Sequence, residues 1–293
     1  MDYYDLPQIS STFLRDFYDD PLRAWEKSPF NADRTHEKPT PQMAIGTLAH
    51  AIFLEPSTVA GRYMITQLAS RRSKAWEDFA RGAAAQGKIP VTSDEYDTAT
   101  AMASYLATRP DVMARMDGAR TEHAITDIRI PYMPDDFPCG KVKFDAVRIC
   151  DGGAEIIDYK TTSDVAAIIH GQGIYYHRWW IQAAWYVHML SVAMDMDVDR
   201  IRFAFLVQSS TPADHRRYAF CGISADYIRQ GMCDIAAMLD DIRCGGWINP
   251  TQDMLAAHYA QGEIMMDPPS WRNHAGDGPW RKMIAPARTE DQI

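Results

Sequence analysis

Two aspartates and one lysine lie within a short segment whose pattern predicts two β-strands. The apolar stretches 141–149 and 154–159 are rich in Val, Phe, Ile and Ala. Between them, residues 151–153 read Asp-Gly-Gly, a sequence that tolerates the positive φ angles of a tight turn. The segment therefore predicts a β-hairpin that carries ionisable side chains among apolar neighbours.

These ionisable residues are Asp145, Asp158 and Lys160. Side chains alternate between the faces of a strand, so Asp158 and Lys160 project on the same side, and Asp145 on the partner strand can stand opposite them. Two close carboxylates repel each other unless a cation lies between them, and their oxygen atoms suit Mg²⁺ or Mn²⁺. A lysine at this spacing can hold or deprotonate a water, or stabilise charge on a phosphate. The pattern indicates metal-assisted phosphodiester cleavage.

The alternative is a surface ion pair between Asp158 and Lys160 on an exposed edge strand, which is the better interpretation of an isolated Asp-x-Lys. The surrounding pattern favours a functional site. Asp145, the glycine-rich turn and the apolar pair Ile156-Ile157 accompany the motif. A charged cluster among apolar residues is costly to bury.

The composition is that of a globular protein. The chain has 293 residues, of which 46% are hydrophobic, enough for one large domain or one domain with an appended segment. It contains no run of about 18 apolar residues, and its N-terminus lacks the pattern of a signal peptide. We therefore expect a cytoplasmic protein without a membrane partner.

Charge and cysteine content restrict the cofactors and partners. The formal charge of −9 argues against a protein that coats nucleic acid through bulk positive charge, but it is compatible with a nuclease that has a local basic lining. The five cysteines are widely spaced and form no Cys-x-x-Cys pair. We therefore expect neither disulfides nor an iron–sulfur cluster.

Hydrophobic periodicity predicts a single domain, residues 1–293, in three parts. Residues 1–120 are mainly helical, residues 121–246 contain the strands and form the catalytic core, and residues 247–293 are irregular because prolines and glycines interrupt them.

An apolar helix expected at residues 43–55 carries one ionisable residue in its interior, His50. Gly46 lies one turn earlier on the same face, where the absence of a side chain would let a backbone or a ligand come close. His50 is therefore a candidate site residue. A hydrogen-bonded core histidine is an equally good interpretation.

Other polar residues could reach the hairpin. The strand expected at 121–131 carries Glu122, which could present a third carboxylate, although a salt-bridged surface glutamate is the alternative. The helix expected at 175–194 places Gln182 and Tyr186 one turn apart on one face. Most aromatic residues of that helix belong to the core, so these two are the polar exceptions.

Several cationic residues are candidates for contact with DNA. Arg71, Arg72 and Lys74 cluster near Trp76, where they could contact phosphates beside an aromatic ring, although such a cluster is usually a solvated face. Arg178 is a further candidate.

Four motifs together resemble the RecB-like PD-(D/E)xK nucleases. They are GTLAH with His50, GKVKFDAVR with Asp145, IIDYKT with Asp158 and Lys160, and QAAWY with Gln182 and Tyr186. Three N-terminal stretches, ISSTFLRDFYDDPLRAW, MAIGTLAHAIFLEP and SKAWEDF, narrow the resemblance to the exonuclease VIII (RecE) nuclease group of phages and prophages. The likeness extends over residues 9–208.

The resemblance implies an α/β fold with a mixed central β-sheet flanked by helices on both faces, preceded by N-terminal helical elements. It further implies a Mg²⁺-dependent exonuclease, in which Mn²⁺ can substitute. Such an enzyme digests double-stranded DNA ends from the 5′ terminus and leaves 3′ single strands for an annealing protein. A ring-shaped homo-oligomer encoded by a phage or prophage, in the cytoplasm of a bacterial cell, is expected.

The resemblance also implies roles for individual residues. Asp145 and Asp158 would bind the metal, together with the Tyr159 carbonyl group, His50 and Glu122. Lys160 would orient the attacking water, and Gln182 with Tyr186 would position the water, the lysine or the DNA strand. Many relatives have Gly-Arg before the first aspartate, and this chain has Val142-Lys143, which puts in doubt any DNA contact made there.

Other functions compete with this interpretation. A RecB-like nuclease could act on single strands within a repair or defence complex, and a restriction-type endonuclease would cut circular duplexes. A non-catalytic DNA-binding protein could also retain the same fold.

Overall fold

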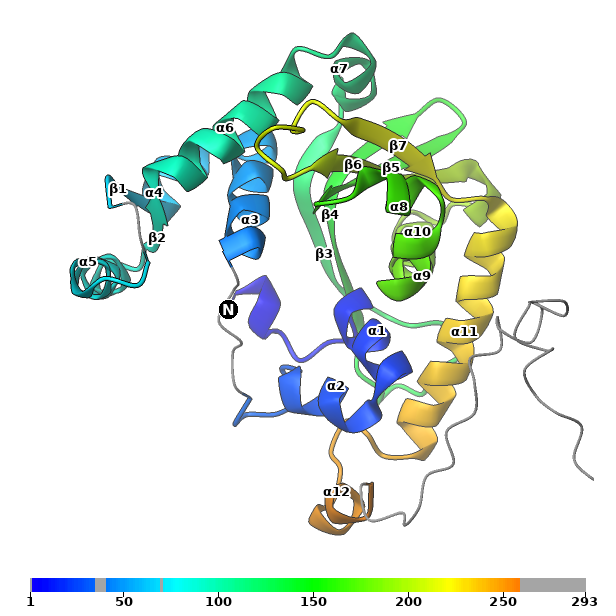
Figure 1. The fold of residues 1–293 in the computed structure, drawn as a ribbon. Helices are drawn as coiled ribbons and strands as arrows, with labels where there is room; N and C mark the ends of the chain where they lie inside the picture. Colours follow the sequence, from blue (N-terminus) through cyan, green and yellow to red (C-terminus); the bar gives the residue numbers. More distant parts are fainter. Residues whose placement is uncertain (1, 35–40, 69–70, 259–293) are drawn as a thin grey trace, which may run out of the picture. The chain divides into compact units, whose positions relative to one another are not determined.

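A five-stranded mixed sheet forms the centre of the fold (Figure 1). The computed structural model describes residues 2–34, 41–68 and 71–258. The strands follow the spatial order β3 (Arg120–Ile128), β4 (Gly140–Cys150), β5 (Gly153–Thr162), β6 (Ile201–Ser209) and β7 (Tyr218–Gly222). The β5–β6 pair is parallel and the other three pairs are antiparallel, which confirms the predicted mixed sheet.

Helices precede, connect and follow the strands along the chain. Their bounds are α1 (Ser11–Asp19), α2 (Pro21–Lys27), α3 (Pro41–Leu54), α4 (Val59–Arg62), α5 (Lys74–Ala85), α6 (Ser93–Ala107), α7 (Pro110–Met116), α8 (Val165–Ile169), α9 (Gln172–Tyr176), α10 (Trp179–Met194), α11 (Ala225–Cys244) and α12 (Gln252–His258). A small parallel pair, β1 (Tyr63–Thr66) and β2 (Ile89–Thr92), lies beside α5 (Figure 1).

The helix boundaries follow from capping residues. Ser10 accepts a hydrogen bond from the Phe13 N–H group at the start of α1. Thr92 caps α6, because its hydroxyl group and the Glu95 carboxylate form a reciprocal capping box.

Two hydrophobic cores lie on opposite faces of the sheet. The first packs α1, α10 and α11 against residues such as Phe144 and Phe205. The second packs α3, α6 and α7 against residues such as Ile157 and Leu206. Burial of one side chain of this size contributes roughly 1.5–3 kcal/mol to the free energy of unfolding. The helices on both faces therefore stabilise the sheet.

Strand β4 changes its pattern at Asp145. Phe144 belongs to the first core, whereas Ala146 belongs to the second, although regular alternation would place both on one face. The register between β4 and β5 ends where Ala146 faces Ile157, and the Asp145 carboxylate then accepts the Tyr159 N–H hydrogen bond at 2.7 Å. This differs from the simple alternation expected of the hairpin, and it directs Asp145 toward the layer that contains α3.

The chain divides into two units, residues 1–250 and 251–293. All strands of the five-stranded sheet belong to the first unit. The predicted tail, residues 247–293, differs from the expectation in that its described part contains the helix α12, and the remainder, from residue 259, lies outside the described residues.

No single helix in residues 2–34, 41–68 and 71–258 is long and apolar enough to cross a membrane. Helix α3 and the segment 56–62 meet the length and composition criteria only together, with a bend of 114° between them.

Candidate active site

Three side chains from separate elements form a compact cluster that could bind a metal ion. His50 comes from α3, Glu122 from β3 and Asp145 from β4, and one ligand atom from each lies within 4.8 Å of the others. The His50 Nε2 atom lies 2.8 Å from Asp145 Oδ2, and its Nδ1 atom lies 3.0 Å from Glu122 Oε1. The structure thus brings together three of the predicted site residues.

Close packing of α3 against β5 positions His50. A Cβ atom on Gly46 would overlap the Thr161 hydroxyl group, so glycine permits the close approach that its position in the helix suggested. The His50 ring stacks on the Tyr159 ring at a centroid distance of 5.9 Å. Glu122 has a φ angle of 51°, an uncommon conformation for a glutamate, and it occurs at the point in β3 that faces the irregularity of β4.

The carboxylates of this cluster control the protonation of His50. Burial disfavours the imidazolium, but the negative charges of Asp145 and Glu122 and their hydrogen bonds outweigh it and raise the pKa of His50 to about 10. Burial raises the pKa of Asp145, but the charge and hydrogen bond of His50 outweigh this effect and lower that pKa below its ordinary value. Without a metal, protonated His50 therefore neutralises the carboxylates.

A second group of polar side chains surrounds Asp158 on β5. Its side chain is 1% exposed, and its Oδ1 atom accepts a hydrogen bond of 2.7 Å from the Gln182 amide on α10. Lys160 forms an ion pair with Oδ2. Arg15 on α1 donates a 3.1 Å hydrogen bond to the other end of the Gln182 amide. This contact fixes the orientation in which Gln182 donates to Asp158.

Burial makes ionisation of Asp158 unfavourable. Loss of hydration, together with the negative charge of Asp145, outweighs the ion pair with Lys160 and raises the Asp158 pKa to about 6. The negative charge of Asp145 contributes to the raised pKa of Asp158. The two carboxylates therefore interact electrostatically, although they lie in different layers of the fold.

The donor set fits a divalent metal ion. Asp158 Oδ2 and Glu122 Oε1 are buried carboxylate oxygens that face the side chains of Lys160 and His50, respectively. Oxygen atoms of this kind suit Mg²⁺ or Mn²⁺. His50, Glu122 and Asp145 are the residues that would hold the ion, and the role of Asp158 as a further ligand stays a prediction.

Tyr159 and Tyr186 contact this site from within the cores. The Tyr159 backbone N–H group binds Asp145, and its hydroxyl group hydrogen-bonds to Gln208. Tyr186 lies one turn after Gln182 and packs edge-on against Phe144, with the ring centroids 5.5 Å apart. Burial raises the Tyr186 pKa well above its ordinary value, so this side chain is a neutral hydrogen-bonding group.

Sequence reasoning missed two neighbours of the site. Arg15 precedes Gln182 by 167 positions, and no local pattern connects the two. Tyr4 is 63% exposed and lies with its ring 5.7 Å from the Lys143 ammonium group, which forms an ion pair with Glu122. Lys143, at the position where the sequence departs from the family pattern, therefore supports Glu122.

The predicted DNA-contact residues do not form one group with the carboxylates. Arg71 makes two hydrogen bonds to Glu95, at 2.8 and 2.7 Å, and lies 4.8 Å over the buried ring of Trp76. These contacts hold Arg71 in place beside the buried Trp76, and contact of this cluster with DNA stays a prediction. Arg72 and Lys74 are exposed near the start of α5.

Arg178 lies at the break between α9 and α10. The sequence predicted one continuous helix over residues 175–194, which includes this break. Arg178 has a φ angle of 55°, forms an ion pair with Asp19 at 2.8 Å and donates to the Tyr175 carbonyl group at 2.6 Å. Its guanidinium group thus holds the α9–α10 junction against α1.

Comparisons with known proteins agree with this fold. Residues 10–244 match a family described as a PDDEXK-like domain of unknown function, DUF3799. No curated protein matches the chain. A crystal structure of a protein from Eubacterium rectale, provisionally described as an exonuclease, covers 91% of this chain and 92% of its own, with a TM-score of 0.55 and 12% sequence identity. At this identity the likeness shows a shared fold.

Proposed function

The chain belongs to the PDDEXK-like family DUF3799 and has the fold of a PD-(D/E)xK nuclease, and from this premise we propose that it is a Mg²⁺-dependent exodeoxyribonuclease. In this proposal it degrades linear duplex DNA from the 5′ end and leaves 3′ single strands. The hydrolytic part is supported by the cluster of His50, Glu122 and Asp145 and by the nearby ion pair of Asp158 with Lys160, whose carboxylate interacts electrostatically with Asp145. The direction of digestion rests on the resemblance to the exonuclease VIII group.

The residues around the metal have distinct tasks in this mechanism. Asp145, Asp158, Glu122 and His50 would hold Mg²⁺, which when bound supplies Lewis acidity for water activation and charge stabilisation. Lys160 can hold the attacking water or stabilise charge on the phosphate, because its ammonium group lies beside Asp158. Gln182 fixes the Asp158 carboxylate, and Arg15 fixes Gln182.

The most direct test of hydrolysis replaces Lys160. We expect Lys160→Ala to lower the rate of duplex degradation about 100-fold or more, since removal of one positioned electrostatic group has an effect of this order. The matched control is Lys88→Ala, because Lys88 is not a candidate site residue and its ammonium group donates to the Ala60 carbonyl group. Mg²⁺-dependent hydrolysis that persists at the original rate in Lys160→Ala would refute the assignment of the site.

Digestion of linear duplexes labelled at either end tests the direction and the substrate. Release of the 5′ label first supports the proposal, and release of the 3′ label first contradicts its direction. Faster degradation of single-stranded than of duplex DNA would favour a RecB-like nuclease of a repair or defence complex. Cleavage of a closed circular duplex would favour an endonuclease.

The proposal extends to assembly and partners. A ring-shaped homo-oligomer would retain the DNA strand between successive cleavages, and a single-strand annealing protein would use the 3′ strands produced. Light scattering in the presence and absence of duplex DNA measures the assembly. A monomer under both conditions would contradict the ring.

A further inference from the structure

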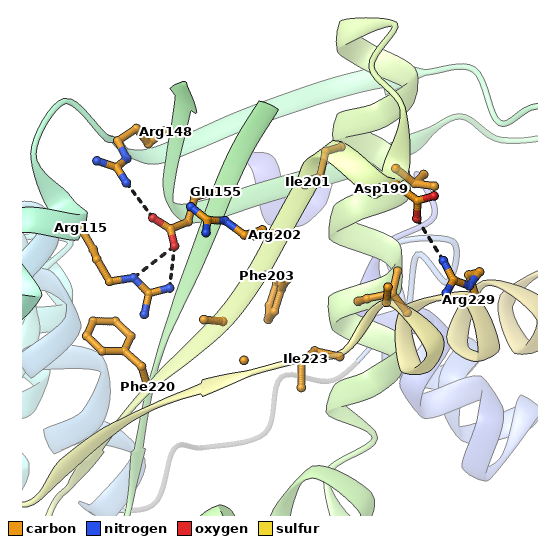
Figure 2. A pocket seen from close by; sticks show the side chains of 15 residues that line it. Arg115, Arg148, Glu155, Asp199, Ile201, Arg202, Phe203, Phe220, Ile223 and Arg229 are labelled. Atoms are coloured by element: carbon orange, nitrogen blue, oxygen red, sulfur yellow. Dashed lines mark hydrogen bonds and ion pairs between the residues drawn. The ribbon is translucent and has the colours of Figure 1, made fainter. Parts of the chain in front are cut away.

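A cavity of about 580 Å³ lies at the end of β6, next to the N-terminal end of α11 (Figure 2). Helix α7, strands β4, β5 and β6, and the first turns of α11 contribute to its lining. Its volume falls in the range of cavities that bind small molecules. None of the candidate active-site residues belongs to the lining of this cavity.

Positive charge exceeds negative charge around Glu155 in this cavity. Arg115 donates two hydrogen bonds to one Glu155 oxygen, at 3.1 and 2.6 Å, and Arg148 donates one to the other oxygen at 2.9 Å (Figure 2). Arg202 stands directly across the β5–β6 pair from Glu155. Three guanidinium groups therefore share one carboxylate, in a chain whose formal charge is −9.

The arginines are not equally available to a ligand. The second acidic residue of the lining, Asp199, forms an ion pair with Arg229 at 3.0 Å, so it does not neutralise the group around Glu155. Arg115 is held with its guanidinium 3.9 Å from the Phe220 ring centroid, which fixes the plane of its donors. Arg202 has an exposed side chain and no hydrogen bond or ion pair to a described residue, beyond its electrostatic effect on Glu155.

The remaining walls are suited to an amphiphilic ligand. Apolar side chains, among them Ile201, Phe203 and Ile223, line the cavity beside the arginines. Ala225, the first residue of the 20-residue helix α11, also lines it, and the N-terminal end of a helix favours negative charge. Guanidinium groups recognise phosphate through paired hydrogen bonds, and an apolar wall accommodates a planar ring.

We propose that this cavity binds a phosphate-bearing ligand of mononucleotide size, with Arg202 as the principal phosphate contact. The choice of a nucleotide rests on the proposed function, since DNA hydrolysis releases nucleoside monophosphates and brings DNA phosphates to the protein. Both sources present the same group, so a free nucleotide and a phosphate of a DNA strand have to be distinguished by experiment.

The test is calorimetric titration of the protein with thymidine 5′-monophosphate in EDTA, where no hydrolysis takes place. We expect one binding site per chain, no binding of thymidine, and at least tenfold weaker binding in Arg202→Gln. The matched control is Arg81→Gln, because Arg81 is 76% exposed and pairs with Asp78 outside the cavity. Lys160→Ala should bind as the wild type does, which separates the cavity from the active site.

Competition with a short single-stranded oligonucleotide distinguishes the two phosphate sources. Displacement of the nucleotide in a manner that depends on Arg202 supports a DNA phosphate in the cavity, and retention of the nucleotide supports the free monophosphate. Absence of binding at millimolar nucleotide, equal weakening in Arg202→Gln and Arg81→Gln, or loss of binding in Lys160→Ala alone would overturn the proposal. This experiment measures nucleotide binding and not hydrolysis. A protein without nuclease activity could still bind the nucleotide, so failure of the nuclease proposal is recognised separately.

Discussion

Asp158 is an ionisable residue that lies almost fully buried in the fold. Its pKa of about 6 lies above the ordinary value of 3.8, so the folded protein holds this proton more tightly than the unfolded chain does. The contribution of Asp158 to stability is fully present below pH 3.8 and is lost as the pH rises through about 6. At neutral pH the metal-free protein therefore has an ionised, poorly compensated carboxylate in its interior.

We expect Asp158→Asn to stabilise the metal-free protein at pH 8 while it abolishes hydrolysis. The asparagine amide oxygen can still accept the Gln182 hydrogen bond, and the ionisation penalty, about 3 kcal/mol for a shift of this size, disappears. Urea unfolding in EDTA at pH 8 and at pH 4 measures the difference, which should be large at pH 8 and small at pH 4.

The control for this comparison is Asp136→Asn, because Asp136 is exposed in the β3–β4 connection. It should change the free energy of unfolding by less than about 0.5 kcal/mol. A metal-free Asp158→Asn protein that is less stable than the wild type at pH 8 would show that the Lys160 ion pair outweighs the cost of burial.

At the scale of elements, the contact between α3 and β5 decides where His50 lies. Alanine in the interior of a helix is normally more favourable than glycine by about 0.5–1 kcal/mol. At Gly46 this preference is reversed, because the added methyl group would overlap the Thr161 hydroxyl group. The glycine is thus a requirement of helix–strand packing one turn before a predicted metal ligand.

We expect Gly46→Ala to destabilise the protein by about 1–3 kcal/mol and to weaken Mn²⁺ binding, since overpacking displaces α3 and with it His50. Thermal unfolding and Mn²⁺ titration measure the two effects. The double variant Gly46→Ala/Thr161→Ala should recover stability, because it removes the overlapping hydroxyl group.

Gly82→Ala is the control for helix propensity, because Gly82 lies within α5 with no neighbour near its added Cβ atom among the described residues. This variant should be as stable as the wild type or slightly more stable. If Gly46→Ala behaves in the same way, the close contact does not limit the position of α3.

The elements that the sequence predicted well are those with local signals. Alternation and the Asp-Gly-Gly turn identified the β4–β5 hairpin, and helical spacing identified α3 with His50 and α10 with Gln182. The remainder depends on contacts between distant segments. The change of face at Asp145 is set by packing between two layers, and the support that Arg15 gives to Gln182 joins residues that no sequence period connects.

At the scale of the whole molecule, both cores and the complete sheet lie within residues 1–250. We expect a chain truncated after Pro250 to unfold cooperatively, at a temperature within a few degrees of the full chain, because it retains these packed layers. Calorimetry of the two chains measures this. A large loss of stability, or loss of cooperativity, would show that residues 251–293 are part of the folding unit.

The order of the strands has a consequence for synthesis of the protein. Strand β5 pairs with β4 on one side and, in parallel, with β6 on the other, and the α10 residue that binds Asp158 lies between β5 and β6 in the chain. A ribosome must therefore translate past residue 209 before the carboxylates of the candidate active site can be fixed in place. Shorter nascent chains lack strand β6, so the candidate active site can form only late in translation.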